Sequence, residues 1–302
     1  MFFTVDDVVR LSRTFRSMPC EVSEEMRGWS WSEPPLLYPY DFLLSASDLG
    51  SGFCETGRYV YMKYVARERE VPGWRLRRGS LIHAVLSEVS RVAKSLILQG
   101  VLDVEDFRGR FIEAGESILG RFRSEFSDLR WVDELFRLLW MRAADAYSSG
   151  LARARARSPY MTADGLAFMT VPFITEFPVD GSLVGLSRTL RIDVLLHPNI
   201  VAEVKTRGWH PDYELGVASY ALAIESQYEV PVNYGIVLLV KVDAKSKDLK
   251  VYERVVRLSD RVRQRFIDVR DSYARIVEES MDPGRPRSCS PDCPFIKACR
   301  EG

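Results

Sequence analysis

Three stretches in the first half of the chain place apolar residues every three or four positions, which is the pattern of an amphipathic helix. The stretches predicted to form long helices are residues 79–98, 104–126 and 131–156. His83 lies one turn into the first of them, and Gly100 ends it. A shorter helix is predicted after Ser45 or Ser47, because either side chain can cap a first turn. The first half of the chain is therefore expected to be largely helical.

After Pro159 the pattern changes to alternation and short apolar runs, which indicates β-strands. The predicted strands are residues 166–178, 183–196, 200–206, 232–240 and 250–256, with helices at 211–226 and 258–279. Residues 232–240 are almost continuously apolar, as in a strand buried on both faces, whereas residues 250–256 alternate like an edge strand. Turns are predicted at 180–181, 197–199 and 245–248. The order β-β-β-α-β-β-α predicts a mixed sheet with helices packed on it.

Both ends of the chain lack this periodicity. Residues 1–39 mix aromatic residues and prolines without a helical repeat, so we expect an ordered extended segment that covers the core. Residues from 283 onward are expected to be irregular. The sequence thus predicts a single domain. Its expected parts are an N-terminal cover (1–44), a helical part (45–160), a sheet-containing core (161–280) and a cysteine-rich segment (281–302).

Composition narrows the class of protein. The 302 residues are 46% hydrophobic and 28% charged, enough for a substantial core, and the 42 basic and 42 acidic side chains cancel. No apolar run approaches the ~20 residues of a membrane span. The first ten residues carry Asp6 and Asp7 and lack the pattern of a signal peptide, so we expect a cytoplasmic protein with no membrane partner. The scarcity of Asn and Gln fits a thermophile. No glycine-rich phosphate loop is present, which argues against a nucleotide-binding fold.

Three charged residues interrupt the apolar pattern of residues 190–207, namely Asp193, Glu203 and Lys205. Glu203 and Lys205 are two residues apart, so on a strand they point to the same face. A hairpin would bring Asp193 near the same end of that face. Two carboxylates and an ammonium are costly to bury unless they pair or hold a metal. The plainer alternative for this stretch alone is a surface hairpin with a Glu–Lys ion pair.

The spacing Asp193…Glu203-x-Lys205 fits the D…(D/E)-x-K site of metal-dependent DNA nucleases. Phosphodiester cleavage uses a hard divalent cation such as Mg²⁺ or Mn²⁺, which is held by oxygen ligands and lowers the pKa of an attacking water. Asp193 and Glu203 would supply carboxylate oxygens, and the carbonyl of Val204 could add another. Lys205 could orient the water or stabilise the negative charge that develops on the phosphate.

The cysteines give a second signal. Cys289, Cys293 and Cys299 lie close together in the sequence, and Cys54 follows the predicted helix break far upstream. Four thiolates suit zinc and an iron–sulfur cluster equally, so the spacing leaves both open. Cys20 is left over and is expected to be a buried structural thiol.

The chain resembles the RecB-type branch of the PD-(D/E)xK nuclease superfamily. More narrowly, it is similar to the iron–sulfur exonuclease of CRISPR adaptation, in its longer archaeal type I-A (Csa) form. The resemblance spans roughly Ser45 to Cys299. The motifs that carry it are Ser45-Ala-Ser-Asp-Leu49 before Cys54, Gly79-Ser-Leu-Ile-His83, Arg191-Ile-Asp193, Glu203-Val-Lys205, Tyr220-Ala-Leu222, the terminal cysteines and, upstream, Gly28-Trp-Ser-Trp31.

This resemblance implies an α/β fold with a restriction-endonuclease-like mixed-sheet core, a helical subdomain and a C-terminal iron–sulfur staple. It implies that His83 joins Asp193 and Glu203 on the metal. It also implies a 4Fe-4S cluster that ties the C-terminus to the helical part. The implied cluster ligands are Cys54, Cys289, Cys293 and Cys299.

The implied function is that of a metal-dependent DNA exonuclease that acts on single-stranded ends. It would process DNA for CRISPR spacer acquisition, together with other CRISPR adaptation proteins. Tyr220 would help to position DNA. The family usually has a glutamine four residues before this tyrosine, where the present chain has Gly216. The alternative is a non-catalytic DNA-binding or scaffold subunit of the adaptation complex, which Gly216 favours and the intact charged residues oppose.

A preference for single strands would require aromatic side chains on which bases can stack. Tyr59, Tyr61 and Tyr64 are the candidates in the sequence, with core packing as the alternative role for each of them.

Overall fold

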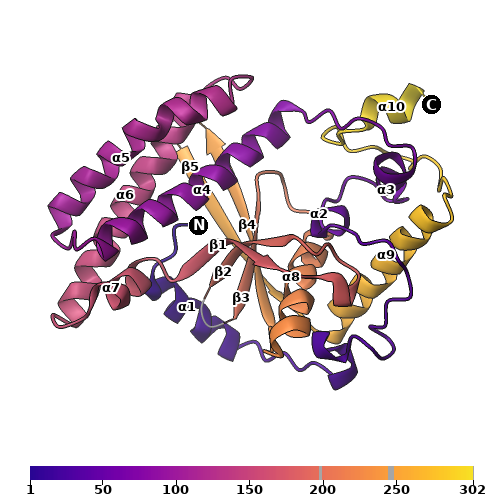
Figure 1. The fold of residues 1–302 in the computed structure, drawn as a ribbon, viewed down its shortest axis with the longest axis horizontal. Coiled ribbons are helices and arrows are strands. Elements are labelled where there is room, and N and C mark those ends of the chain that lie inside the picture. The colour runs from indigo at the N-terminus through magenta and orange to yellow at the C-terminus, as the bar shows by residue number, and fades with distance from the viewer. Residues whose placement is uncertain (197–198, 244–247, 302) are drawn as a thin grey trace.

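The computed structural model describes residues 1–196, 199–243 and 248–301, which form a five-stranded sheet flanked by helices (Figure 1). The strands are β1 (Phe173–Val179), β2 (Leu190–Leu196), β3 (Ile200–Lys205), β4 (Tyr234–Asp243) and β5 (Asp248–Arg257). The helices are α1 (Val5–Arg16), α2 (Ala46–Leu49), α3 (Arg58–Val60), α4 (Trp74–Leu98), α5 (Val104–Glu125), α6 (Val132–Arg157), α7 (Ala163–Thr170), α8 (Tyr213–Tyr228), α9 (Asp260–Glu278) and α10 (Ile296–Glu301). Short 3₁₀ turns cover Glu24–Met26, Gly28–Ser30 and Ser182–Val184, and a π-turn covers Tyr61–Val65.

The sheet contains both parallel and antiparallel pairs, so the mixed sheet predicted from the order of the elements is confirmed. Its strand order is β1-β2-β3-β4-β5, and only β3 and β4 pair in parallel, joined by α8 as the crossover helix. The other neighbours are antiparallel. β5 lies at the edge, and the middle of β4 is buried on both faces, so the predictions for these two strands are confirmed.

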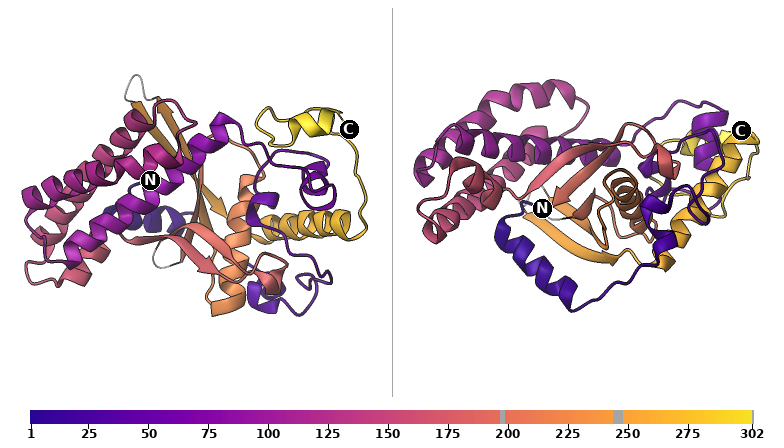
Figure 2. Two further views of the ribbon diagram at one scale, coloured as in Figure 1. Left: turned by 45° about the horizontal axis from the view of Figure 1, so that its top comes forward. Right: turned by 60° about the horizontal axis from the view of Figure 1, so that its bottom comes forward.

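Helices cover both faces of the sheet (Figures 1 and 2). On β3, the side chains of Ala202 and Val204 join the core formed with α4, α5 and α6, whereas Val201 joins the core formed with α8 and α9. This alternation follows from the two-residue period of a strand. It places Glu203 and Lys205 on the same side as Val201, so they face the α8 layer. The charged residues of β3 therefore lie on the face of the sheet that α8 covers.

The N-terminal cover differs from the expected extended segment, because α1 occupies part of it. A capping box between Thr4 and Asp7 closes the first turn of α1. Leu11 and Phe15 are buried, and the ring of Phe15 stacks on Tyr234 with centroids 4.4 Å apart. The apolar stripe of this helix is narrow, since most of its other positions are polar or charged. With so few apolar positions, the sequence pattern did not predict this helix.

Several predicted boundaries were also wrong. Residues 166–170 belong to helix α7, so the first strand begins only at Phe173. The second strand begins at Leu190 and not at residue 183, because a 3₁₀ turn intervenes and Gly185 adopts a left-handed φ of 79°. Helix α4 begins five residues earlier than predicted, and the C-terminal segment ends in α10. The predicted turns at 197–198 and 245–247 lie outside the described residues.

None of the helices within the described ranges combines the length and the apolar character needed to cross a membrane.

Candidate functional site

The site forms where β2 and β3 separate. Their antiparallel pairing ends at Val194 and Ala202, so the next residues of β3 have no ladder partner on β2. The free N–H of Val204 donates instead to Asp193 Oδ2 at 2.8 Å. The carbonyl of Val204 lies 3.0 Å from His83 Nε2. Because buried backbone N–H and C=O groups must find partners, the diverging strands hold Asp193 and His83 at the same residue, Val204.

His83 comes from α4, and its ring is oriented from both sides. With Nε2 donating to the carbonyl of Val204, the other ring nitrogen, Nδ1, faces Asp193 Oδ1 at 3.6 Å. A histidine that binds a metal commonly donates its second ring N–H to a backbone carbonyl in this way. Val204 was predicted to give its carbonyl to the metal, whereas here that carbonyl contacts His83. The structure thus brings His83, Asp193 and Val204 together.

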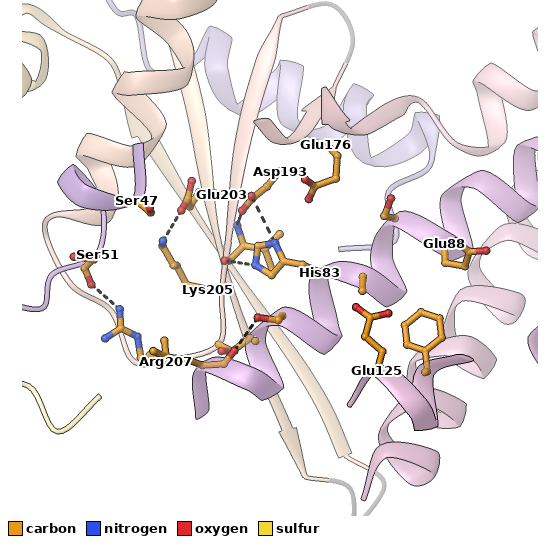
Figure 3. A pocket seen from close by; sticks show the side chains of 18 of the residues that line it. Ser47, Ser51, His83, Glu88, Glu125, Glu176, Asp193, Glu203, Lys205 and Arg207 are labelled. Atoms are coloured by element: carbon orange, nitrogen blue, oxygen red, sulfur yellow. Dashed lines mark hydrogen bonds and ion pairs between the residues drawn. The ribbon is translucent and has the colours of Figure 1, made fainter. Parts of the chain in front are cut away.

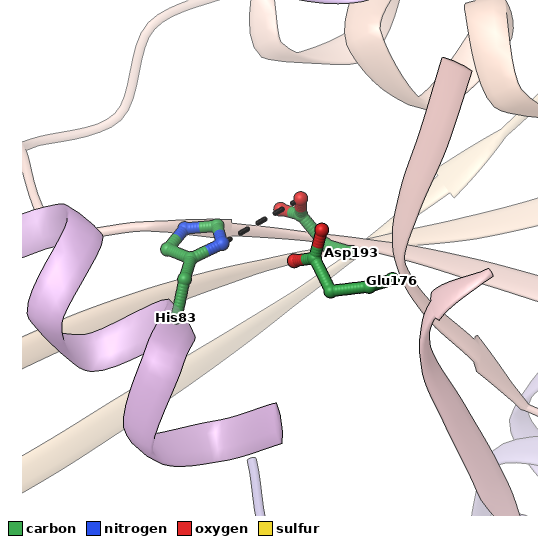
Figure 4. Close-up of side chains that lie close together, drawn as sticks. All are labelled: His83, Glu176 and Asp193. Carbon is green, nitrogen blue, oxygen red and sulfur yellow. Dashed lines mark ion pairs between the residues drawn. The ribbon is translucent and has the colours of Figure 1, made fainter. Parts of the chain in front are cut away.

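Glu176 completes a cluster that sequence reasoning missed. One ligand atom each from His83, Glu176 and Asp193 can be chosen so that all lie within 4.8 Å of one another (Figure 4). Glu176 lies on β1 and has a left-handed φ of 52°, a conformation that non-glycine residues rarely adopt. A carboxylate in the middle of a strand was the only sequence signal. The sequence does not show that Glu176 lies opposite Asp193, because this depends on the register between β1 and β2.

Glu203 and Lys205 form an ion pair with each other on the neighbouring part of β3 (Figure 3). Glu203 is only 5% exposed, and its Oε2 has no hydrogen-bond partner among the described residues. The predicted ligand Glu203 is therefore close to the cluster but outside the group of three. A buried carboxylate oxygen without a donor is costly, so Glu203 still offers an oxygen to a cation or to a water molecule.

Helix α8 adds two residues to this region. The hydroxyl of Tyr220 donates to Asp193 Oδ1 at 3.4 Å, and burial raises its pKa well above the usual value, with Asp193 and Glu203 adding to the effect. The phenol therefore stays protonated as a donor. Gly216 lies four residues earlier, and a Cβ there would lie 3.3 Å from Glu203 Oε2. The position at which the resemblance implies a glutamine thus directly faces this carboxylate, and glycine supplies no donor to it.

Burial, together with the nearby Glu203 carboxylate, raises the pKa of Asp193 to about 6. His83, the Val204 N–H and Lys205 oppose this shift. Two acids and a histidine around one point, beside a carboxylate with an unsatisfied oxygen, form a donor set that suits Mg²⁺ or Mn²⁺. A bound cation would relieve the desolvation of these carboxylates.

A cleft of about 700 Å³ gives access to the cluster (Figure 3). At one end it is lined by Ser51, Phe53 and Arg207, and the Arg207 guanidinium stacks on Phe53 at 4.4 Å. At the other end it reaches Arg121 and Glu125 on α5. His83, Asp193 and Lys205 lie between these ends, so a linear polymer could pass the cluster with chain on either side.

The upstream residue Cys54 lies near the three C-terminal cysteines, Cys289, Cys293 and Cys299. Burial is the main cause that raises the pKa of the Cys293 thiol to about 11, and the nearby Cys54, Cys299 and Cys289 contribute to this shift. Arg58 Nη1 lies 3.2 Å from Cys299 Sγ, while its Nε and Nη2 bind Asp282 at 2.8 to 3.1 Å. Arg58 thus joins the C-terminal segment to the region that carries Cys54. Cys20 is half-buried and not fully buried as predicted.

The tyrosines proposed for base stacking do not form an exposed platform. Tyr59 is 7% exposed and packs against Phe53 and Phe295. Tyr64 donates to Asp48 Oδ2 at 2.6 Å, and Tyr61 is half-buried. Their main role is in the core, which was the alternative that the sequence left open.

The chain is similar to known proteins over its whole length. A family model described as "CRISPR-associated exonuclease Csa1" matches residues 1–302. The CRISPR-associated exonuclease Csa1 of Saccharolobus solfataricus is 37% identical over 310 aligned positions, covering 99% of each chain. The protein of the same name from Thermoproteus tenax is 33% identical over 300 positions, covering 98% of this chain and 99% of the relative. No solved structure matches.

Proposed function

The chain belongs to the Csa1 family of CRISPR-associated exonucleases and is a nuclease; from this premise we propose that it is a Mg²⁺- or Mn²⁺-dependent exonuclease that degrades DNA from single-stranded ends. The observation that carries the proposal is the convergence of His83, Glu176 and Asp193 in one cleft, beside the Glu203–Lys205 pair. A hydrolytic site for phosphodiesters needs an acidic cluster with an adjacent cation of this kind.

His83, Glu176 and Asp193 would hold the metal, and Glu203 lines the same cleft. The bound ion would polarise the phosphate and generate a hydroxide-like nucleophile from water. Neighbouring residues of the chain hold these ligands in position. The carbonyl of Val204 fixes the ring of His83, and the Val204 N–H and the Tyr220 hydroxyl orient Asp193. Lys205, which is paired with Glu203 in the cleft, would orient the attacking water and offset negative charge on the phosphate.

We further propose that the four cysteines hold a 4Fe-4S cluster. Their convergence from positions 54 and 289–299 supports a shared ligand, and the similarity to iron–sulfur nucleases favours iron over zinc. Such a group would close a very long loop, where constraint of the unfolded chain is largest in principle. Its role would be structural, holding the C-terminal segment against the helical part beside the cleft. The Arg58–Asp282 ion pair would support the same contact.

The biological role would be the processing of DNA for CRISPR spacer acquisition, with other CRISPR adaptation proteins as partners. The names of the two relatives support the CRISPR setting. The alternative is a non-catalytic DNA-binding or scaffold subunit. The observation in its favour is Gly216, which leaves the Glu203 carboxylate without the donor that a glutamine would provide.

Digestion of two single-stranded DNAs of equal length distinguishes these functions. One is linear and labelled at one end, and the other is covalently closed. With Mn²⁺ or Mg²⁺ the protein is expected to degrade the linear DNA and to spare the circle, whereas EDTA stops the reaction. Binding of the linear DNA without metal-dependent degradation would support the scaffold function. Rapid cleavage of the circle would contradict an exonuclease.

A further inference from the structure

A cavity of about 610 Å³ lies outside the catalytic cleft, at the edge strand β5 and beside the starts of α8 and α9. Four of its lining residues are arginines from two different elements: Arg254 and Arg257 lie on β5, and Arg261 and Arg265 lie on the first two turns of α9. We call this site the arginine cavity. Because the chain has equal numbers of basic and acidic side chains, it has no general excess of positive charge that would explain this concentration.

Three of the four guanidinium groups have no acidic partner. Within the described ranges, Arg254, Arg257 and Arg261 are exposed and take part in no ion pair and no side-chain hydrogen bond. Arg265 differs, because its Nη2 pairs with Asp212 and its Nη1 donates to a backbone carbonyl at 3.1 Å. Three guanidinium groups at the cavity are thus available to a ligand.

Acidic side chains near the cavity do not neutralise it. Among the described residues, Glu214 is the one carboxylate in the lining. Asp260 follows the lining residue Ser259, but its carboxylate accepts the N–H and the hydroxyl of Ser23 and is therefore bound to the N-terminal cover. Glu253 on β5 pairs with Arg10 at 2.7 Å. The unpaired side chains that line the cavity therefore carry three positive charges and one negative charge.

Arginines on an edge strand can also serve only to prevent pairing with another chain. That role is open to Arg254 and Arg257, since β5 is the last strand of the sheet. It does not account for Arg261, which brings its charge to the same cavity from α9. Arg254 also stacks on Trp209, with its guanidinium carbon 3.6 Å from the ring centre. Stacking uses the flat face of the guanidinium and leaves the N–H groups at its edge free for an acceptor.

The register of the sheet places the arginine cavity close to the catalytic residues. Glu203 on β3 pairs with Val237 on β4, and Val237 pairs with Arg254 on β5. Paired residues point to the same face and neighbouring strands are about 4.8 Å apart, so the backbone of Arg254 lies roughly 10 Å from that of Glu203. The cavity and the catalytic cleft thus lie in neighbouring parts of the same face of the sheet.

The loop that follows β3 joins these two parts. Lys205 Nζ lies 5.1 Å from the centre of the Tyr213 ring, and Tyr213 packs edge-to-face against Trp209 with ring centres 6.0 Å apart. Trp209 in turn stacks on Arg254, and Pro211, two residues further along the loop, lines the arginine cavity. A polymer that extends from the catalytic cleft along this loop therefore reaches the arginines.

We propose that the arginine cavity binds phosphate groups of the DNA strand beyond the part held in the catalytic cleft. The proposal rests on the proposed nuclease function for the identity of the polymer. A guanidinium presents parallel N–H donors that match two oxygens of a phosphate, and such contacts hold a strand whatever its sequence. The cavity thus retains the DNA while its end is cleaved.

Binding of fluorescein-labelled oligo(dT) of two lengths, measured in EDTA, tests the proposal without any dependence on catalysis. Lengths of about 6 and about 30 nucleotides serve, because one site for single-stranded DNA covers roughly 4–16 nucleotides. A double variant with Arg257→Gln and Arg261→Gln should bind the long oligonucleotide about tenfold more weakly than the wild type, since two charge-assisted contacts are lost. Its affinity for the short oligonucleotide, which the catalytic cleft can hold alone, should be unchanged.

The dependence of binding on salt gives a second readout. Each phosphate contact to a single strand contributes about 0.7 to the slope of log affinity against log salt concentration, so the double variant should lower the slope for the long oligonucleotide by about 1.4. The matched control combines Arg142→Gln with Arg188→Gln, which removes the same charge from two exposed arginines outside the cavity. The control should bind both lengths as the wild type does.

A double variant that binds the long oligonucleotide like the control, with the same salt dependence, would overturn the proposal. An equal loss of affinity for both lengths would also overturn it, because the arginines would then act on the strand in the catalytic cleft. Digestion with Mn²⁺ is measured separately. A wild type that binds the long oligonucleotide through these arginines but does not digest it would refute the nuclease function and leave the arginine cavity as a DNA site.

Discussion

Glu176 lies opposite Asp193 in the β1–β2 pair, between the paired positions Thr175–Val194 and Phe177–Ile192. The left-handed φ of Glu176 breaks the regular pleat at this point, and its carboxylate lies with that of Asp193 beside His83 (Figure 4). Two facing carboxylates repel each other unless a cation lies between them. This relationship supports the proposal that the cluster holds a metal ion.

Replacing Glu176 should impair metal binding. We expect Glu176→Gln to weaken Mn²⁺ binding at least about tenfold, because even the loss of an outer-sphere partner of a metal has an effect of that size. Isothermal titration with Mn²⁺ measures it. Glu125→Gln is the matched control, since Glu125 lines the same cleft but lies outside the cluster. Equal Mn²⁺ affinity of Glu176→Gln and Glu125→Gln would show that Glu176 is not a ligand.

Asp193 should make the stability of the metal-free protein depend on pH. Its pKa is raised from 3.8 to about 6 in the folded state, so its protonated form stabilises the fold at acidic pH. That contribution is complete below about pH 4 and is lost as the pH rises through about 6, up to roughly 3 kcal/mol. In EDTA, Asp193→Asn should therefore melt at a higher temperature than the wild type at pH 7 but not at pH 4. Mn²⁺ should raise the Tm of the wild type at pH 7 and leave the variant unchanged. A difference in Tm that does not change with pH would contradict this assignment.

The cysteines can be tested by colour and metal content. The protein purified without oxygen is expected to be brown and to contain iron, and Cys299→Ser should lose both the visible absorbance and the iron. Cys20→Ser is the matched control and should keep them, because Cys20 is remote from the other four in sequence and packs near Tyr234. A colourless wild type with stoichiometric zinc would establish the zinc alternative.

The N-terminal cover is held by a buried ion cluster. Glu225 on α8 accepts from Arg27 and Arg263 and from the backbone N–H of Gly28, at 2.5 to 2.9 Å. Glu225→Gln leaves two buried guanidinium groups without a counter-charge, so we expect a loss of about 3–5 kcal/mol in the free energy of unfolding. Urea unfolding measures it, with the exposed Glu279→Gln as the control. A loss as small as that of the control would show that the cover is held by its apolar contacts alone.

The sequence predicted the strand and helix order of the core, and it singled out His83 and Asp193, which the structure brings together, because each signal there is local. The charged positions of β3 and the apolar repeat of α4 can be read without knowing the fold. Glu176 could not be found in this way, since its role depends on the register between β1 and β2 and on a backbone conformation that no residue pattern announces.

The central claim is that Lys205 acts in catalysis at a metal cluster formed by other residues. Its most direct test is the rate at which wild type and Lys205→Ala degrade end-labelled single-stranded DNA, measured with Mn²⁺ at concentrations that titration shows to saturate both proteins. The wild type should degrade the DNA, and Lys205→Ala should be slower by about a hundredfold or more while still binding Mn²⁺, as expected for the loss of a transition-state contact. A wild type that leaves the DNA intact, or a metal-saturated Lys205→Ala that degrades it at the wild-type rate, would contradict the account.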